Sequence, residues 1–142
     1  MTWPVDYGQL LSEWVTLRSD CAHLPPEDRV MLVNDWWFRA PIVNKSISWQ
    51  DYPNWPDPWQ LLQQDGWCDL ARALGIVYTL LLIDTNSGDS ISLVNTNLGN
   101  LVLAGHGKYI LNWAPGNLLN IESTPITIQR QLCGDLFLAF TE

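Results

Sequence analysis

Tryptophan is the feature that most constrains how this chain can fold. Nine tryptophans occur in 142 residues, and six of them fall between Trp36 and Trp67. Each indole presents a large apolar surface that prefers to leave water, and a buried ring N–H usually finds a hydrogen-bond partner. The chain therefore needs an extensive core around this segment, a partner surface that covers it, or a ligand such as a sugar that stacks on exposed rings.

The first two hypotheses concern the same side chains. In one, the tryptophans fasten an irregular loop onto the core. In the other, they contact another protein subunit, and the candidate interface residues are Trp36, Trp37, Trp55 and Trp59. Charged residues make up only 15% of the chain, against roughly 25% in typical soluble domains. Such a weakly polar surface indicates burial against a partner.

Charge and hydropathy exclude several classes of partner. The formal net charge is −8, which predicts no nucleic-acid partner and no anionic membrane surface. No apolar run approaches the ~20 residues of a membrane helix. The first residues have neither a basic nor an apolar segment, so we expect no signal peptide. The three cysteines lack a C-x-x-C pair, and we predict that they are reduced and that the protein holds no metal or cofactor.

The order of predicted elements indicates an α+β fold in one domain spanning residues 1–142. A helical layer occupies residues 1–40, with a helix over 5–18 and a second helix that opens at Pro25 and ends before Pro41. A loop rich in tryptophan and proline follows over 41–57. Short helices are expected over 58–64 and 67–74, the first capped by Asp57 and the second closed by Gly75.

An antiparallel sheet is predicted after these helices. The expected strands cover residues 76–83, 90–94, 101–104, 109–112, 118–121, 126–129 and 136–140. The Gly-His-Gly-Lys segment at 105–108 predicts a hairpin turn between two of them. Helices first and strands afterwards favour helices packed on an antiparallel sheet.

Cys68 is the candidate nucleophile, because it lies behind a glycine at the start of a predicted helix, where a thiol pKa is lowered. A catalytic cysteine also needs a base and an orienting group. The candidate base is His106 and the candidate orienting residue is Asn112. The other histidine, His23, lies in a polar segment typical of solvated surface.

Residues 58–112 resemble the transglutaminase-like or papain-like cysteine-peptidase core. In that family a P-x-x-L-L leader precedes G-x-C-x-x-A at a helix start, and strands that supply a histidine and then an aspartate or asparagine follow. The matching residues here are Pro58, Leu61, Leu62, Gly66, Cys68 and Ala71. The resemblance implies a core of this type and gives Asn112 the third position.

The chain departs from that pattern at the position of the base. The strand start that should carry the histidine reads Gly99-Asn100, and His106 lies in the turn instead. An asparagine cannot accept a proton from a thiol near neutral pH. We therefore expect an inactive peptidase-like scaffold, with a cysteine hydrolase or acyl transferase as the alternative and a carbohydrate-binding module as a second alternative.

Two segments also resemble small proteins of tailed bacteriophages, especially contractile-tailed ones. They are residues 34–41 and 55–79. This resemblance implies a non-enzymatic structural component of a virion, in the neck, tail or baseplate, assembled in the host cytoplasm. Its partners would be other protein subunits.

Overall fold

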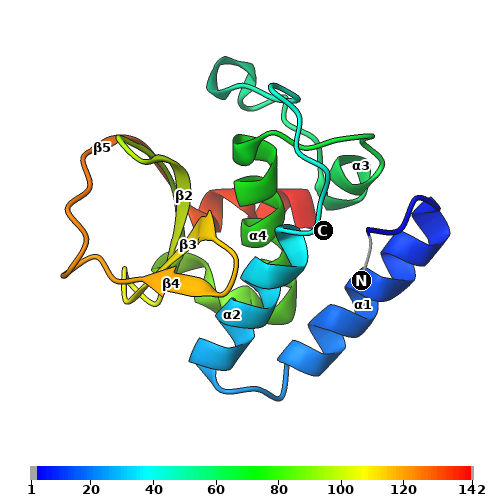
Figure 1. Ribbon diagram of the computed structural model, residues 1–142, viewed down its shortest axis with the longest axis horizontal. Helices are drawn as coiled ribbons and strands as arrows, with labels where there is room; N and C mark the ends of the chain where they lie inside the picture. The colour runs from blue at the N-terminus through cyan, green and yellow to red at the C-terminus, as the bar shows by residue number, and fades with distance from the viewer. Residues whose placement is uncertain (1–2, 142) are drawn as a thin grey trace.

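Helix α4 (Asp69–Ile83) lies in the middle of the molecule, with an antiparallel sheet on one side and helix α1 (Tyr7–Cys21) on the other (Figure 1). Helix α2 (Pro26–Trp37) contacts both α4 and the sheet. This computed structural model describes residues 3–141. The α+β architecture, with N-terminal helices packed against a five-stranded antiparallel sheet, is confirmed.

Helix α1 begins at the cap that the sequence predicts. The Asp6 carboxylate accepts a hydrogen bond from Gln9 N at 3.1 Å, and the helix continues to Cys21, beyond the expected end at residue 18. Helix α2 carries Pro26 in its first turn and ends at Trp37, before Pro41 as expected.

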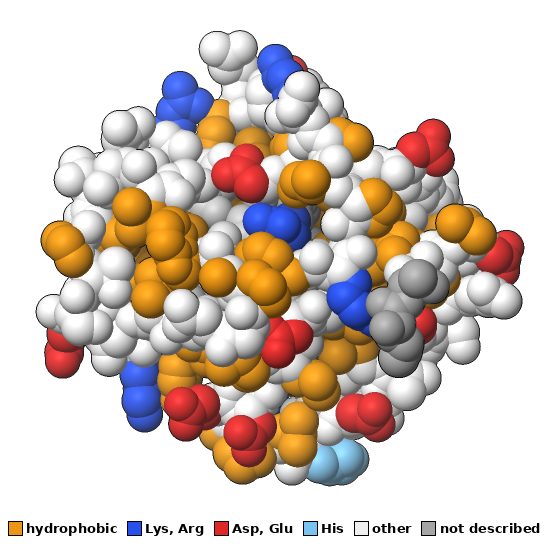
Figure 2. Space-filling model, viewed as in Figure 1, with side chains coloured by type: hydrophobic (Ala, Val, Ile, Leu, Met, Phe, Trp, Pro, Cys, Tyr) orange, Lys and Arg blue, Asp and Glu red, His pale blue; other side chains and the backbone are white. Residues whose placement is uncertain are grey.

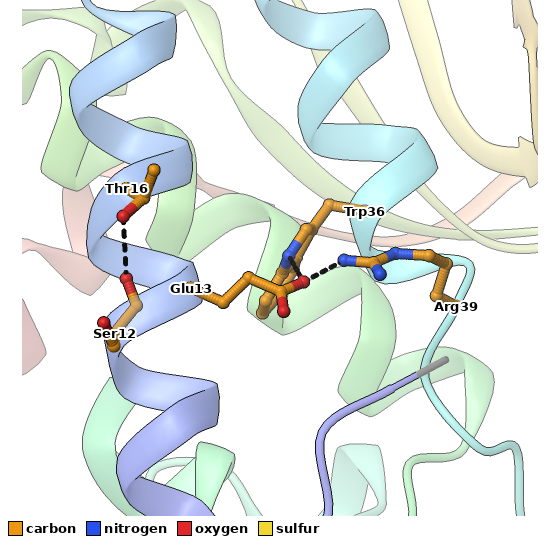
Figure 3. Close-up of polar contacts among 5 residues, drawn as sticks. All are labelled: Ser12, Glu13, Thr16, Trp36 and Arg39. Atoms are coloured by element: carbon orange, nitrogen blue, oxygen red, sulfur yellow. Dashed lines mark hydrogen bonds and ion pairs between the residues drawn. The ribbon is translucent and has the colours of Figure 1, made fainter. Parts of the chain in front are cut away.

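A polar contact joins α1 to the end of α2 (Figure 3). Glu13 accepts a hydrogen bond from Trp36 Nε1 at 2.9 Å and forms an ion pair with the Arg39 guanidinium. One turn along α1, the Thr16 hydroxyl donates to the Ser12 carbonyl at 3.0 Å. Because Glu13 satisfies its ring N–H, Trp36 can be buried without losing a hydrogen bond.

Helix α4 corrects the prediction of a short helix over 67–74 followed by a strand over 76–83. The second half of this segment has the apolar and β-branched composition of a strand. Its buried residues, however, point to every side of the helix, which is the pattern of a helix enclosed by protein. The sheet, α1, α2 and the C-terminal turn all contact α4, and this enclosure overrides local β-propensity.

Gly75 lies in the interior of α4 rather than at a C-cap. A Cβ at this position would run into the indole ring of Trp37. Glycine costs a helix interior roughly 0.5–1 kcal/mol relative to alanine. That cost is offset by the close approach of α2 to α4, which places the ring of Trp37 directly over the helix backbone.

One turn beyond Gly75, a single hydroxyl group connects three helices. Thr79 Oγ1 accepts hydrogen bonds from Trp14 Nε1 at 2.9 Å and from Trp37 Nε1 at 3.0 Å, and it donates to the Gly75 carbonyl at 2.7 Å. A hydroxyl has one donor and two acceptor positions, so this one is fully used. Trp14, Trp37 and Thr79 are all completely buried.

Residues 41–57 form the predicted loop, which contains a 3-10 turn at Trp49–Asp51. Trp55 points inward and donates its ring N–H to the Ser48 carbonyl at 2.6 Å. Helix α3 (Pro58–Leu62) follows, and it begins with a reciprocal capping box between Asp57 and Gln60, as the sequence indicates.

The sheet order is β4-β3-β2-β1-β5, with all neighbours antiparallel. The strands are β1 (Ser92–Thr96), β2 (Gly99–Ala104), β3 (Tyr109–Ala114), β4 (Asn117–Leu119) and β5 (Ile128–Cys133). The predicted hairpin turn at 105–108 is confirmed, while β1, β4 and β5 are shifted by one or more residues from their expected bounds. Residues 136–140 are not a strand. They belong to a 3-10 helix, η3 (Gly134–Thr141), because Phe137 turns into the core against Trp55 and Tyr78.

The two faces of the sheet differ in what covers them. Leu93, Val102 and Leu111 stand in register on the face that packs against α4. The opposite face carries a smaller apolar cluster, which Leu98, Leu119 and Ile126 cover. The cluster consists of Val94, Leu101, Leu103 and Ile110.

The Thr79 hydroxyl is predicted to be a major source of stability. Thr79→Val keeps the shape of the side chain but leaves two buried indole N–H groups without an acceptor, so we expect it to lower the free energy of unfolding by about 3 kcal/mol or more. Thr79→Ser keeps the oxygen and loses one methyl group, which costs about 1 kcal/mol. Urea unfolding of both variants measures the difference, and equal losses would contradict this role.

Candidate functional site

Cys68 is the N-cap residue of α4, at the place where the sequence predicts a nucleophile. The loop over 41–57 closes over it, and the residue is only 4% exposed. The Ser46 hydroxyl donates to Cys68 Sγ at 3.3 Å and accepts from Cys68 N at 3.1 Å. The Sγ atom also lies 3.7 Å from the Ile47 carbonyl. The thiol is therefore held in a defined position with little access to solvent.

Opposing effects set the pKa of the Cys68 thiol. Burial raises this pKa, because the thiolate loses contact with water. Hydrogen bonds from the Ser46 hydroxyl and from backbone amides, including that of Ala71 in the first turn of α4, lower it. The hydrogen bonds outweigh burial, so the pKa of Cys68 lies below its ordinary value. The lowered pKa favours the thiolate form, while burial limits the access of other molecules to it.

Asn100 and Cys68 line the same hollow, where the resemblance requires a histidine as base. Three hydrogen bonds hold the Asn100 side chain in place. Its Oδ1 accepts from Trp49 Nε1 at 2.8 Å and from Asn95 Nδ2 at 3.0 Å, and its Nδ2 donates to Asp69 Oδ1 at 3.2 Å. An amide does not take up a proton near neutral pH, and this one has no free lone pair to offer. Asn100 therefore holds the loop, the sheet and α4 together and cannot serve as a base.

His106 lies at the other end of α4 from Cys68. It is in the turn between β2 and β3, and its backbone N–H donates to the Ser90 carbonyl at 3.0 Å. Its neighbour Gly105 lines a hollow together with Leu80, near the C-terminal end of the helix. Cys68 caps the opposite end, and α4 has 15 residues, a length on the order of 20 Å. The structure therefore does not bring His106 and Cys68 together. The second histidine, His23, is exposed between α1 and α2.

Asn112 does lie close to the site, but in a structural role. Its Nδ2 donates to the Asp69 carbonyl at 2.9 Å and to the Asn100 carbonyl at 2.7 Å. Its Oδ1 accepts from Arg72 Nε at 2.6 Å, and its backbone N–H donates to Asn34 Oδ1 at 2.8 Å. The regular pairing of β2 with β3 ends before this residue, whose φ is +70°. The Asn112 side chain thus replaces the ladder bonds and ties β2 to the start of α4.

Three residues that complete the site were not singled out from the sequence: Ser46, Asp69 and Arg72. Asp69 and Arg72 share the first turn of α4 with Cys68, so helical spacing was a signal that could have found them. Ser46 precedes Cys68 by 22 residues and lies in an irregular loop, where no local pattern marks it.

Three of the four candidate interface tryptophans belong to the core. The exposed fractions are 6% for Trp36, 1% for Trp37 and 4% for Trp55, whereas Trp59 is 37% exposed. Indole rings of this size are buried here against one another and against α4, as the packing hypothesis states. Among these four residues, only Trp59 is exposed enough to contact a partner protein.

Comparison with known protein families, curated proteins and solved structures found no match to this chain. Within residues 3–141, no group of three or more His, Cys, Asp and Glu side chains is arranged to hold a metal ion. In the same range, no helix has the length and hydropathy needed to cross a membrane.

Substitutions at Asn112 should separate its backbone role from its side-chain role. Asn112→Gly tolerates the positive φ but removes the side-chain hydrogen bonds, and we expect it to lower the free energy of unfolding by about 2–4 kcal/mol. Asn112→Ala loses the same bonds and adds left-handed backbone strain, so it should cost about 1 kcal/mol more. Chemical denaturation of both variants provides the test. If alanine proved no worse than glycine, the strained backbone would not matter.

The hydrogen bond from Ser46 is predicted to keep the pKa of Cys68 low. Ser46→Ala should move the pH profile of Cys68 alkylation by iodoacetamide upward, as followed by mass spectrometry of the peptide that contains Cys68. Because the pKa is lowered in the folded state, this group adds stability above the unfolded pKa of about 8.5 and loses that contribution as pH falls through the folded pKa. The unfolding free energy of Ser46→Ala should therefore rise less steeply across this window.

Ser48→Ala is the matched control for this measurement, since the Ser48 hydroxyl bonds to Asp51 and not to the thiol. Its alkylation profile should coincide with that of the unsubstituted protein. A Ser46→Ala profile that also coincides would show that this hydroxyl does not set the pKa of Cys68.

Proposed function

We propose that this protein is a non-enzymatic structural or assembly component that acts through protein–protein contacts. We further propose that it works in a tailed-phage virion, in the neck, tail or baseplate, with other protein subunits as partners. The resemblance of residues 34–41 and 55–79 to small proteins of tailed bacteriophages supports the virion as its location.

One observation carries the non-enzymatic part of the proposal: the residue that lines the hollow with Cys68, at the position where the resemblance puts the base, is Asn100, and its amide oxygen already accepts two hydrogen bonds. A thiol attack on an amide needs a group that accepts a proton and later returns it to the leaving amine. Neither histidine of the chain lies at this hollow. The low exposure of Cys68 agrees with a structural role for the thiol.

The spatial order of the site supports a degenerate transglutaminase-like or papain-like core as the origin of the fold. A helix N-terminus presents Cys68, the second strand presents Asn100, and the third strand presents Asn112. This is the arrangement that the resemblance implies, with asparagine in place of histidine. In the proposed history, loss of the base left a rigid polar cluster that now joins the helix to the sheet.

Exposed apolar side chains support contact with partners. Figure 2 shows apolar side chains gathered in several separate patches on one face, while acidic side chains are spread over it. Trp59 on α3 and Trp113 on β3 are the exposed tryptophans of residues 3–141. They lie on different elements and do not make a stacking pair, so they give little support to a sugar-stacking platform.

A cysteine hydrolase or acyl transferase is the second candidate, and the lowered pKa of Cys68 favours it. In that case a base would have to be supplied by a group outside this site, such as a residue of a partner protein.

Genetic complementation can test the assembly function. Phage particles that lack this gene product should be defective, and both the unsubstituted chain and Cys68→Ser should restore them. Trp59→Ala should restore them poorly, because a well-packed interface tryptophan contributes about 2 kcal/mol or more to binding. Trp113→Ala is the control of similar exposure. Mass spectrometry of purified particles gives the occupancy of the protein in each case.

Two outcomes would contradict the proposal. One is the absence of the protein from purified particles. The other is loss of function in Cys68→Ser while its unfolding free energy stays near that of the unsubstituted protein, because such a result requires chemistry at the thiol.

A further inference from the structure

A shallow hollow lies in front of Cys68, between the loop over 41–57 and the edge of the sheet. Its volume is about 320 Å³, at the small end of ligand-binding pockets. It has room for one side chain and not for a large cofactor. The lining residues that matter for its chemistry are Lys45, Trp49, Cys68, Asp69, Asn100 and Arg130.

The hollow carries positive charge in a strongly acidic protein. Lys45 and Arg130 are both exposed, and within residues 3–141 neither forms an ion pair. Asp69 is the acidic residue of the lining, and its two carboxylate oxygens accept hydrogen bonds from the backbone and side chain of Asn100. Two basic side chains therefore remain available to an anionic group that enters the hollow.

The remaining arginines are engaged within the fold. Arg39 pairs with Glu13, and Arg72 donates to Asn112. Arg29 donates to backbone carbonyls at the end of α1 and beyond it, and Arg18 lies over the ring of Trp14. Unlike Arg29, Arg39 and Arg72, neither Lys45 nor Arg130 has an acidic or carbonyl partner in the described part of the chain. Arg18 has none either, but it is half-buried, whereas Lys45 and Arg130 are exposed.

A free backbone edge runs beside this hollow. Strand β5 is the last strand of the sheet, and within residues 3–141 only β1 pairs with it. Residues 128–131 are exposed on both faces of the strand. An unpaired edge of this kind accepts an extended peptide through backbone hydrogen bonds.

The sheet register places Arg130 on the side of the hollow. Arg130 stands opposite Asn95, and Asn95 stands opposite Asn100, so the three side chains form a row on one face of the sheet. Asn100 lines the hollow, and the Arg130 guanidinium lies 5.9 Å from the ring centre of Trp49. A peptide on β5 that points a side chain to this face would deliver it next to Arg130.

We propose that this surface binds an extended acidic segment of a partner protein. The segment adds a strand to β5 and places a carboxylate side chain in the hollow between Lys45 and Arg130. The proposal rests on the proposed function as an assembly component and specifies the chemistry of its partner.

Charge favours an acidic partner over a second copy of this chain. Pairing β5 with β5 of another copy would bring two like-charged Arg130 side chains close together, with no acidic side chain of β5 to offset them. An acidic segment instead meets the two free basic side chains.

Peptide titrations can test this inference. The probes are two acetylated and amidated peptides, one alternating valine with glutamate and the other alternating valine with glutamine. We expect the glutamate peptide to bind more tightly and to shift the backbone amide signals of β5 in NMR spectra. Arg130→Gln and Lys45→Gln should each weaken its binding by roughly two- to fivefold, the effect of an exposed ion pair.

Two controls separate charge from strand pairing. Lys108→Gln removes the same charge in the turn between β2 and β3, remote from the hollow, and should leave the affinity unchanged. A glutamate peptide with N-methyl groups at alternate backbone positions should lose its binding, because it cannot pair with a strand edge.

The inference would be overturned if neither peptide bound, if both bound equally well, or if the shifted amide signals lay outside β5. These outcomes leave the assembly function intact when the protein is still found in purified particles. Conversely, a glutamate peptide that binds at β5 and is then cleaved would refute the non-enzymatic function while supporting the binding surface.

Discussion

The Thr79 hydroxyl group is the interaction on which the helical half of this structure depends. Two indole N–H groups, one from α1 and one from α2, donate hydrogen bonds to this oxygen in the middle of α4. The hydroxyl itself donates a hydrogen bond to the α4 backbone. In a dry core, an indole without an acceptor is expensive, so the positions of Trp14 and Trp37 are coupled to one another through Thr79. The glycine one turn earlier lets the ring of Trp37 come close enough to make this bond. A tryptophan-rich chain therefore solves two problems at once, since the large rings fill the core and their N–H groups fix how the helices are arranged.

The same principle applies at the other end of α4, where amide side chains take the place of the hydroxyl. The Asn112 side chain donates to the carbonyls of Asp69 and Asn100, and the Asn100 side chain donates to the Asp69 carboxylate. These bonds join the first turn of α4 to β2 and β3. A catalytic centre needs groups whose hydrogen-bonding capacity is partly free for a substrate. Here Asn100 and Asn112 direct most of that capacity to other groups of the protein, and the Cys68 thiol is enclosed beside them. In the function that we propose, this polar cluster is a structural junction between the helix and the sheet.

Local signals in the sequence predicted local structure well. The caps at Asp6 and Asp57 and the turn at 105–108 depend on neighbouring residues, and all three are confirmed. The helix over 69–83 was partly predicted as a strand, because its enclosure on every side is set by elements distant in sequence. The identity of Asn100 is readable from the sequence. The hydrogen bonds that occupy its Oδ1 are not, since Trp49 lies 51 residues away in an irregular loop. Likewise, the tryptophan pattern required burial somewhere, but only the packed structure shows that Trp36, Trp37 and Trp55 are covered by the chain itself.

The enclosure of α4 also has a consequence for how this protein is made. Because its apolar residues face in all directions, the helix has no side that can safely meet water. During synthesis the α4 segment leaves the ribosome before the strands that cover it, so its apolar residues have no sheet to pack against until β1 to β5 are made. A chain truncated within the sheet would therefore expose this apolar surface and would be prone to aggregate.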